Sequence, residues 1–436
     1  MNNGKKTKIK VIISIALVLV LVAGIIRLLT PREQPSDFDY SLMEETGDVN
    51  AEQPVLMGEA AELYSLNLEE PLYQKNADER IDPYSITKIL TGYLAMKYLD
   101  LDQIVEVSEY AATPLPDGTT IFLNPGEKIS VRDLLYGAML ESGNDAATAL
   151  AEAVSGSEEA FADLMNRQVM EWGCRDTHFV NANGWKNENH YTTAHDMAII
   201  TAKSFENKKF RKISLTRKYV IDATNMSGPR YLENHTRRGT KQLKDLTCGK
   251  TGGWTSKDCS IAVGFSRDDI EGIAVVLRTT VGRRRDDARR LIEYGMIATP
   301  GYIVANEGDV VCQTEIKGGA DPIADLYIDD TLKAYPKGHD KSGIEVSIER
   351  DELEAPVAKG TKAGTYTLYA DGKKIKTGEL FTAEDVEKGW FLSDYGVSDE
   401  TTKKLLRFIG VWALAFAVVQ ILLKRFLPVD KTGLSE

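Results

Sequence analysis

Ser85 and Lys88, which stand three residues apart, are the first residues in the chain whose types and spacing could do chemistry. They follow Pro83 and open a stretch with apolar residues at helical spacing, so we expect both side chains on one helix face. A buried lysine that has lost its proton can accept the proton of a serine nucleophile. Most such pairs are solvated surface pairs, but no other serine in this chain has a lysine three residues on.

The tripeptide Ser142-Gly143-Asn144 is a second candidate. It stands between two apolar segments, LLYGAML and DAATALAEAV, which predicts a loop between buried elements. A hydroxyl and an amide on such a loop can point into a cleft. The simpler interpretation is an ordinary helix N-cap, a position at which serine and asparagine are common.

The tripeptide Lys-Thr-Gly occurs three times, at 250–252, 376–378 and 431–433, so the string by itself means little. The second copy falls in a region with strand patterning near the C-terminus, and the third follows the last apolar segment. Only the first copy shares a predicted domain with Ser85 and Ser142, and β-rich residues 258–266 follow it. We therefore take Lys250-Thr251-Gly252 as the third element of the site.

The three elements occur in the order SxxK, SxN, KTG. In this order the chain resembles the low-molecular-mass penicillin-binding proteins, the serine-type D-alanyl-D-alanine carboxypeptidases of peptidase family S11. Longer stretches over about residues 56–390 are similar too, among them LYQKNADERIDPYSITKILTGY, LNPGEKISVRDLLYGAMLESGNDAATALAEAVSG, MNRQVMEWGCRDTHFVNANGW, HYTTAHDMA and, near the end, ELEAPVAKG. The resemblance implies removal of the terminal D-alanine from peptidoglycan stem peptides, and inhibition by β-lactams.

The resemblance also implies a role for each residue that matches a motif. Ser85 would be the nucleophile and Lys88 its general base. Ser142 would relay a proton to the leaving D-alanine, and Asn144 would hold the substrate amide. No metal or cofactor is implied.

Further roles concern the substrate carboxylate and the developing oxyanion. Lys250 would add positive charge, and Thr251 would bind the terminal carboxylate. The backbone N–H groups of Ser85 and Gly253 would form the oxyanion hole, in which each donor contributes about 3–4 kcal/mol. The chain departs from the family here, because Gly253 intervenes before an aromatic residue, Trp254, that would usually follow KTG directly.

A basic residue for the substrate carboxylate is expected in the segment GRRRDDARRLIEYG. Arg284 fits best, although Arg283 and Arg285 are equally basic and stay open as alternatives. A second departure lies at Asp258-Cys259, where the family usually has two small residues.

Two other functions remain open at this stage. A serine β-lactamase shares SxxK and KTG, but it needs an efficient deacylating base, and no ExxLN segment follows the SxN motif. A catalytically silent protein that binds the cell wall is the other alternative, and the three intact motifs argue against it.

Both ends of the chain have the character of membrane segments. Four lysines precede the apolar run Val11–Ile26, and no small-x-small cleavage site follows, which indicates an uncleaved signal anchor, the alternative being a cleaved signal peptide. Phe408–Leu423 carries no charge and, with its flanks, is just long enough to span, the alternative being a helix on the membrane surface. We expect the bacterial cell membrane, both termini inside and the catalytic domain outside the cytoplasm.

Between these segments the pattern predicts an α+β protein, with helices on an antiparallel sheet followed by a small all-β domain. The resemblance implies that the first of these is a penicillin-binding, transpeptidase-like domain. The 436 residues are too many for one ordinary core. The expected divisions are 1–30 (anchor), 31–55 (spacer), 56–300 (catalytic domain), 305–385 (small β domain), 386–404 (linker) and 405–427 (membrane helix).

Composition excludes several classes of protein. The net charge of −12 argues against a nucleic-acid partner, and four cysteines without a CxxC pair argue against a zinc ribbon or a disulfide scaffold. Cys248 and Cys259 are equidistant from a hairpin midpoint between Gly253 and Trp254. If the hairpin closes there, the two cysteines are opposite each other and within disulfide range, the alternative being two separate buried thiols.

Overall fold

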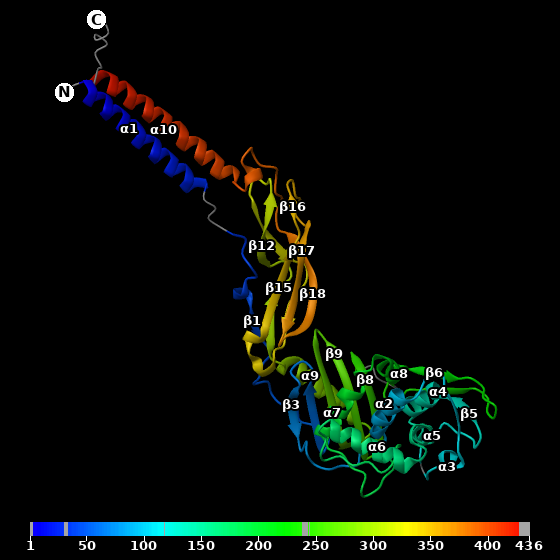
Figure 1. Ribbon diagram of the computed structural model, residues 1–436. Helices are drawn as coiled ribbons and strands as arrows, with labels where there is room; N and C mark the ends of the chain where they lie inside the picture. Colours follow the sequence, from blue (N-terminus) through cyan, green and yellow to red (C-terminus); the bar gives the residue numbers. More distant parts are fainter. Residues whose placement is uncertain (1–2, 30–33, 117, 238–242, 244, 427–436) are drawn as a thin grey trace. The chain divides into compact units, whose positions relative to one another are not determined.

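The computed structural model describes residues 3–29, 34–116, 118–237, 243 and 245–426 (Figure 1). The chain divides into two compact units. The first, called here the anchor unit, comprises Met1–Glu44, Tyr302–Ala334 and Lys341–Glu436. The second, the catalytic unit, comprises Glu45–Gly301 and Tyr335–Asp340.

The catalytic unit is built on a five-stranded antiparallel sheet in the order β3-β2-β10-β9-β8. The order makes β8, which carries the Lys-Thr-Gly motif, an edge strand of this sheet. The strands are β2 (Ala60–Ser65), β3 (Glu70–Lys75), β8 (Leu246–Thr255), β9 (Asp258–Arg267) and β10 (Ile270–Thr279). Two short hairpins lie outside it: β4 (Ile104–Glu106) with β5 (Lys128–Ser130), and β6 (Lys218–Ile221) with β7 (Arg230–Glu233).

Helices cover both faces of the sheet, and alternation along the strands explains why. Ile261 and Val263 belong to the apolar cluster that includes Leu291 of α9, whereas Ala262 between them belongs to the cluster formed with the other helices. Because successive side chains of a strand point to opposite faces, an uninterrupted apolar run places apolar side chains on both faces of the sheet. Each face must then be covered by helices. The helices are α2 (Lys88–Tyr98), α3 (Glu109–Ala112), α4 (Val131–Tyr136), α5 (Asn144–Ser155), α6 (Glu158–Glu171), α7 (Ala194–Ser204), α8 (Lys208–Leu215) and α9 (Arg284–Ala298).

The anchor unit contains the all-β region that the loss of helical periodicity predicts. Its main sheet has the order β15-β17-β18-β13-β12-β16, and a short sheet has the order β1-β11-β14. The strands are β1 (Glu44–Thr46), β11 (Gly301–Ala305), β12 (Val310–Lys317), β13 (Ile323–Ile328), β14 (Leu332–Ala334), β15 (Ile344–Arg350), β16 (Leu353–Glu354), β17 (Lys362–Ala370) and β18 (Lys373–Thr382). The expected fold class, α+β with a small β domain, is confirmed.

The spacer expected at 31–55 needs correction for its described part. Phe38 is buried in the core of the β region, and the Asp39 N–H donates to the carbonyl oxygen of Val311 at 2.8 Å. Further along, the Asp48 N–H donates to the carbonyl oxygen of Ile297 at 2.8 Å. Polar composition concealed these contacts because one aromatic residue and backbone hydrogen bonds are enough to hold an extended segment.

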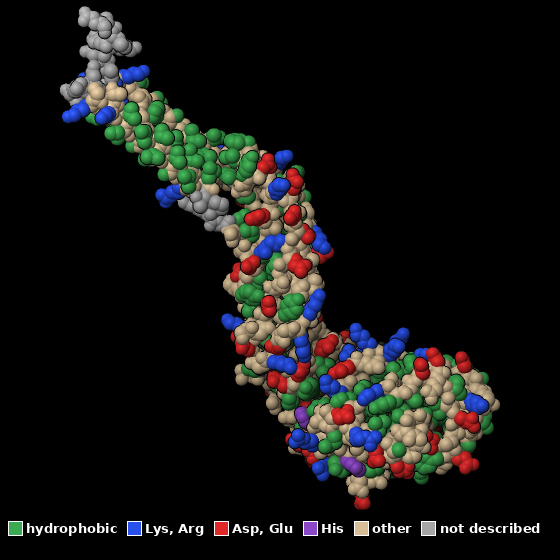
Figure 2. Space-filling model, viewed as in Figure 1, with side chains coloured by type: hydrophobic (Ala, Val, Ile, Leu, Met, Phe, Trp, Pro, Cys, Tyr) green, Lys and Arg blue, Asp and Glu red, His purple; other side chains and the backbone are tan. Residues whose placement is uncertain are grey.

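Two long helices, α1 (Asn3–Leu29) and α10 (Asp399–Phe426), form the ends of the described chain. Both are long and apolar enough to cross a membrane. Figure 2 shows their outer surface as almost continuously hydrophobic, unlike the mixed charged surface of the rest of the molecule. This surface is weak evidence of membrane association.

The expected juxtaposition of Cys248 and Cys259 is wrong. The β8–β9 hairpin closes at the pair Thr255 and Asp258, so its midpoint lies three residues later than the assumed one, with a register shift after Gly253. Cys248 is therefore opposite Gly264, and Cys259 is opposite Gly253. All four cysteines are free and buried.

Candidate active site

Ser85 lies in a 3-10 turn, Tyr84–Thr87, that runs directly into α2 at Lys88. One turn of helix separates the two residues, and Lys88 Nζ lies 3.1 Å from Ser85 Oγ. The Lys88 side chain is fully buried. The local helical spacing therefore creates the contact between a hydroxyl and an amine.

Two further oxygens surround the amine of Lys88. Its Nζ donates to Asn144 Oδ1 at 2.7 Å and to the carbonyl oxygen of Asn183 at 2.6 Å. Both atoms can only accept, whereas the Ser85 hydroxyl can also donate. A neutral amine fits this site completely, because it donates two hydrogen bonds and has one lone pair left for the serine proton.

Burial of Lys88 favours that neutral form. Burial, with the nearby Lys250 as the second cause, holds the pKa of Lys88 well below its usual value. The carboxylates of Asp145 and Glu158 act in the opposite direction but do not outweigh burial. A lysine in this state is a base at a pH at which free lysine is an acid.

Ser142 and Lys250 form a second hydroxyl–amine pair. Lys250 Nζ donates to Ser142 Oγ at 2.9 Å. The same Nζ donates to the carbonyl oxygen of Thr251 at 3.0 Å. Burial, with Arg284 as the second cause, lowers the pKa of Lys250 to about 7. The two pairs lie together because Asn144, two residues after Ser142, binds Lys88.

The helical region that begins with α4 at Val131 is interrupted where Ser142 stands, between the two apolar segments. A short π-helical segment, Gly137–Glu141, ends at Ser142, whose φ of 65° lies in the left-handed region. Only then does α5 begin at Asn144. The break directs the Ser142 hydroxyl toward Lys250 and the Asn144 amide toward Lys88.

The edge strand β8 passes very close to the turn that holds Ser85. A Cβ added at Gly252 would lie 2.9 Å from the carbonyl oxygen of Pro83 and 3.1 Å from the Ser85 nitrogen. Glycine is therefore required at this position. Thr251 on one side is buried, while Gly253 on the other is exposed.

The structure distinguishes the three candidate arginines. Arg284 Nη1 donates to the carbonyl oxygen of Gly252 at 3.0 Å, so it lies against the strand that carries Lys250. Arg285 Nη2 instead donates to the carbonyl oxygen of His235 at 2.7 Å, and Arg283 is more than half exposed beside Asp286. Arg284 is the one of these three that contacts the Lys-Thr-Gly motif.

The departures from the family pattern have structural consequences. The Tyr84 hydroxyl donates to Asp258 Oδ2 at 2.5 Å, which ties the turn of Ser85 to the start of β9. Trp254 is 44% exposed and stacks edge-on against Trp185, with ring centroids 4.6 Å apart. The rim of the site therefore has an aromatic pair from two separate segments.

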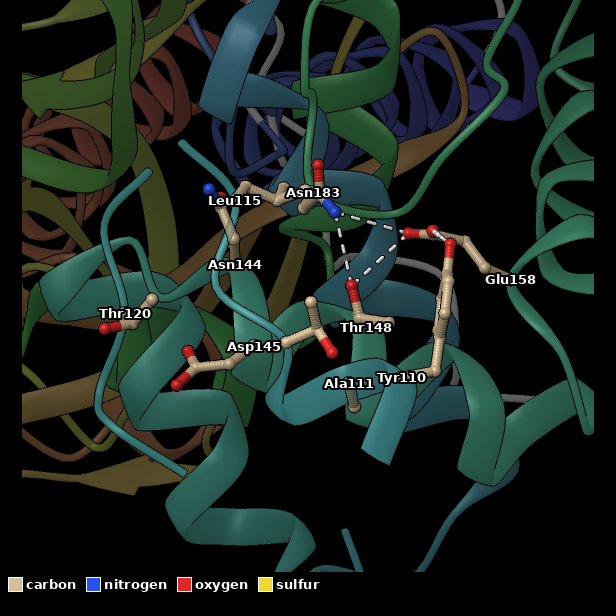
Figure 3. Close-up of a pocket in the computed structure, with 10 residues that line it drawn as sticks. Tyr110, Ala111, Leu115, Thr120, Asn144, Asp145, Thr148, Glu158 and Asn183 are labelled. Carbon is tan, nitrogen blue, oxygen red and sulfur yellow. Dashed lines mark hydrogen bonds between the residues drawn. The ribbon is translucent and has the colours of Figure 1, made fainter. Parts of the chain in front are cut away.

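Sequence reasoning missed Asn183 and Glu158. The backbone oxygen of Asn183 binds Lys88, and the Glu158 carboxylate holds the Asn183 side chain. A backbone acceptor has no sequence signature, and Glu158 reads as an ordinary first-turn helix residue. The two residues also line a cavity of about 120 Å³ that reaches Asn144 (Figure 3).

Comparison with known proteins agrees with this geometry. A family model described as D-alanyl-D-alanine carboxypeptidase matches residues 48–280, and the C-terminal domain of penicillin-binding protein 5 matches residues 303–388. The carboxypeptidase DacF of Bacillus subtilis is 30% identical over 331 residues, which are 74% of this chain and 84% of DacF.

Solved structures extend the match. Penicillin-binding protein 5 of Haemophilus influenzae has a TM-score of 0.54 and 26% identity, covering 78% of this chain and all of that one. The DD-transpeptidase of Streptomyces K15 has a TM-score of 0.52 and 27% identity, covering 56% of this chain and 99% of that one.

The fold and the two hydroxyl–amine pairs define a serine hydrolase of the penicillin-binding class. Because the family model matches more than half of the chain, and a 30% identical relative is covered over most of its length, the chain belongs to the D-alanyl-D-alanine carboxypeptidase family. The resemblance is confirmed, and with it the expectation of a serine-type carboxypeptidase that binds β-lactams and acts on peptidoglycan peptides. Family membership favours this function over the β-lactamase and the silent wall-binding protein.

Proposed function

We propose that the chain removes the terminal D-alanine of peptidoglycan stem peptides through an acyl-enzyme on Ser85. The observation that carries this mechanism is the environment of Lys88: two acceptors for its N–H groups and one hydroxyl facing its lone pair. Ser85 Oγ attacks the carbonyl carbon of the penultimate D-alanine while its proton passes to Lys88 Nζ. The backbone N–H groups of Ser85 and Gly253 stabilise the resulting oxyanion.

Breakdown of this intermediate requires a proton on the leaving amine. Ser142 donates it and is reprotonated through Lys250, whose amine is 2.9 Å from the Ser142 hydroxyl. Free D-alanine leaves, and the peptide stays attached to Ser85 as an ester. Lys88 passes the proton taken from Ser85 to solvent, and Lys250 regains one, so both amines return to their starting states. Water then attacks the ester and gives its proton to Lys88, which returns it to Ser85 Oγ as the shortened peptide leaves.

The terminal carboxylate of the substrate is held by cations and hydroxyls on and beside β8. Lys250 supplies charge, Thr251 a hydroxyl, and Arg284 a guanidinium anchored on the Gly252 carbonyl oxygen. Asn144 binds the substrate amide. A β-lactam carries a carboxylate and a strained amide in a similar arrangement, so Ser85 opens its ring and remains acylated.

Release of D-alanine from a synthetic pentapeptide by the purified protein tests this function. We expect the enzyme to release one D-alanine from each pentapeptide over many turnovers. Prior labelling of the enzyme with fluorescent penicillin should block this release. Rapid turnover of nitrocefin would support a β-lactamase instead. Absence of both penicillin labelling and D-alanine release would leave a silent wall-binding protein.

For localisation, we propose that α1 and α10 cross the bacterial cell membrane as an antiparallel pair, with both termini inside and the catalytic unit outside the cytoplasm. Gln420 Nε2 donates to Ser14 Oγ at 2.9 Å, and Phe408 packs against Gly24 at the other end of the pair. A Cβ added at Gly24 would lie 2.3 Å from the Phe408 ring, and such close approach is typical of helices that associate in lipid.

Deleting either helix alone should leave the protein in the membrane fraction, because each is long enough to span. Removing residues 1–33, with a cleavable signal to restore export, tests α10. Removing both helices should release a soluble, penicillin-binding chain of residues 34–398. If the chain without α1 is already soluble, α10 does not span, and if carbonate at high pH strips it from membranes, α10 lies on the surface.

A further inference from the structure

Glu158, the first residue of α6, is a buried carboxylate that the mechanism above does not use. Four hydrogen-bond donors point at it, and Figure 3 shows three of them converging from separate segments. They are Tyr110 Oη at 2.7 Å, Ala182 N at 3.1 Å, Thr148 Oγ1 at 3.3 Å and Asn183 Nδ2 at 3.3 Å. A group of donors of this kind is the environment of an ionised carboxylate.

Two of these donors belong to the segment that binds the proposed general base. Glu158 Oε1 accepts from the backbone of Ala182 and from the side chain of Asn183, whose own carbonyl oxygen is 2.6 Å from Lys88 Nζ. The Thr91 hydroxyl, on the same helix as Lys88, donates to the Ala182 carbonyl oxygen at 2.6 Å. Glu158 thus fixes both residues of a short segment whose backbone contacts the catalytic helix.

The cavity of about 120 Å³ adds a second link. Glu158, Asn183 and Asn144 all line it, so the two residues that accept hydrogen bonds from Lys88 border one small space together with Glu158. A single residue, Asn183, links the Glu158 carboxylate to the Lys88 amine by a hydrogen bond to each.

We propose that Glu158 is a positioning residue for the general base: it holds the Asn183 carbonyl oxygen against Lys88 and stabilises the protonated form of that lysine. The inference rests on the proposed role of Lys88 as the base. Its chemical logic is that a base must not only lose its proton in the resting site but also accept one in the transition state. A nearby carboxylate makes that acceptance more favourable.

Lys88 has other charged and titratable neighbours besides Glu158. Lys250 on β8 lowers the pKa of Lys88, and Asp145 on α5 acts with Glu158 to raise it. The Asp145 carboxylate is occupied by the N–H groups of Ile121 and Leu123. His190, bonded to Thr87, has a pKa lowered by burial to about 3, so it stays neutral over the working range.

Two variants separate charge from geometry. Glu158→Gln keeps a side-chain oxygen that accepts from Ala182, Thr148 and Asn183. The Tyr110 hydroxyl can turn to accept a hydrogen bond from the new amide NH₂ group. The Ala182-Asn183 segment therefore stays in place while the negative charge is lost. Glu158→Asp keeps the negative charge, but its shorter side chain places the carboxylate farther from Ala182 and Asn183. Glu159→Gln is the matched control, because Glu159 is the next residue and is exposed.

The measurement is the pH profile of acylation by a fluorescent penicillin, with the melting temperature recorded for each variant. In Glu158→Gln the ascending limb of the acylation rate against pH should move to lower pH by about one unit. The reason is that loss of a negative charge makes Lys88 harder to protonate. In Glu158→Asp the limb should stay within a few tenths of a unit of wild type while the plateau rate falls several-fold. Glu159→Gln should match wild type in both.

If the limb of Glu158→Gln coincides with that of Glu159→Gln, Glu158 is only a structural residue and the inference is wrong. A shift of the limb in Glu158→Asp equal to that in Glu158→Gln would also overturn it, and this variant decides the matter if Glu158→Gln does not fold. Absence of acylation in the wild type would instead reject the proposed function, which keeps the two failures distinct.

Discussion

Ser85→Ala should abolish penicillin labelling and lower the rate of D-alanine release by at least about 10⁴-fold, because the proposed acyl bond forms on the Ser85 hydroxyl. The effect should fall on the rate and not on the fold, since the Ser85 hydroxyl contacts only Lys88 among the hydrogen bonds of the described residues. Mass spectrometry after penicillin treatment should place the adduct of the wild type on the peptide that contains Ser85.

Ser256→Ala is the control for this experiment. Ser256 is an exposed serine in the turn between β8 and β9, close to the site in sequence but outside the two hydroxyl–amine pairs. It should retain labelling and release. An adduct on any residue other than Ser85 would contradict the mechanism.

Lys88→Ala should reduce the acylation rate by about 100- to 10,000-fold, the range typical of a lost general base. The change also leaves the Asn183 carbonyl oxygen and Asn144 Oδ1 without their donor, which costs about 1–3 kcal/mol of stability for a buried group. Lys97→Ala, on the exposed side of the same helix, is the control and should keep its activity.

The wild-type pH profile tests the protonation state directly. In the proposed mechanism Lys88 acts when neutral, so the acylation rate should rise as pH increases through a pKa well below the usual 10.5 of lysine. Lys250, with a pKa lowered to about 7, titrates within the same range. Lys250→Arg separates the two, because arginine stays charged, and an ascending limb that belongs to Lys88 should persist in this variant.

A profile that is flat from about pH 5 to about pH 10 would contradict a titrating lysine base. If the rise of the acylation rate with pH disappears in Lys250→Arg, the titrating group is Lys250 and not Lys88.

Much of the site could be predicted because its elements are local in sequence. A serine and a lysine at helical spacing meet in any helix, which is why Ser85 and Lys88 were identifiable before their surroundings were known. The fold class was also accessible, since apolar alternation and helical periodicity report on neighbouring residues. The order of the three motifs then indicated the family.

Other features depended on contacts between distant segments. The choice of Arg284 over Arg283 and Arg285 follows from where α9 begins beside β8, which no local pattern reports. The pairing of Cys248 with Cys259 failed because a register shift and a later turn moved every residue of the hairpin.

By itself the sequence determined which groups are present and which of them lie one helical turn apart, because covalent spacing sets helical neighbours. Only the tertiary structure lowers the pKa of Lys88, since desolvation arises from packing of the whole unit around the amine. It also decided that Asn183 and Glu158 belong to the site, because a backbone oxygen and a buried carboxylate acquire a function only through the atoms brought against them.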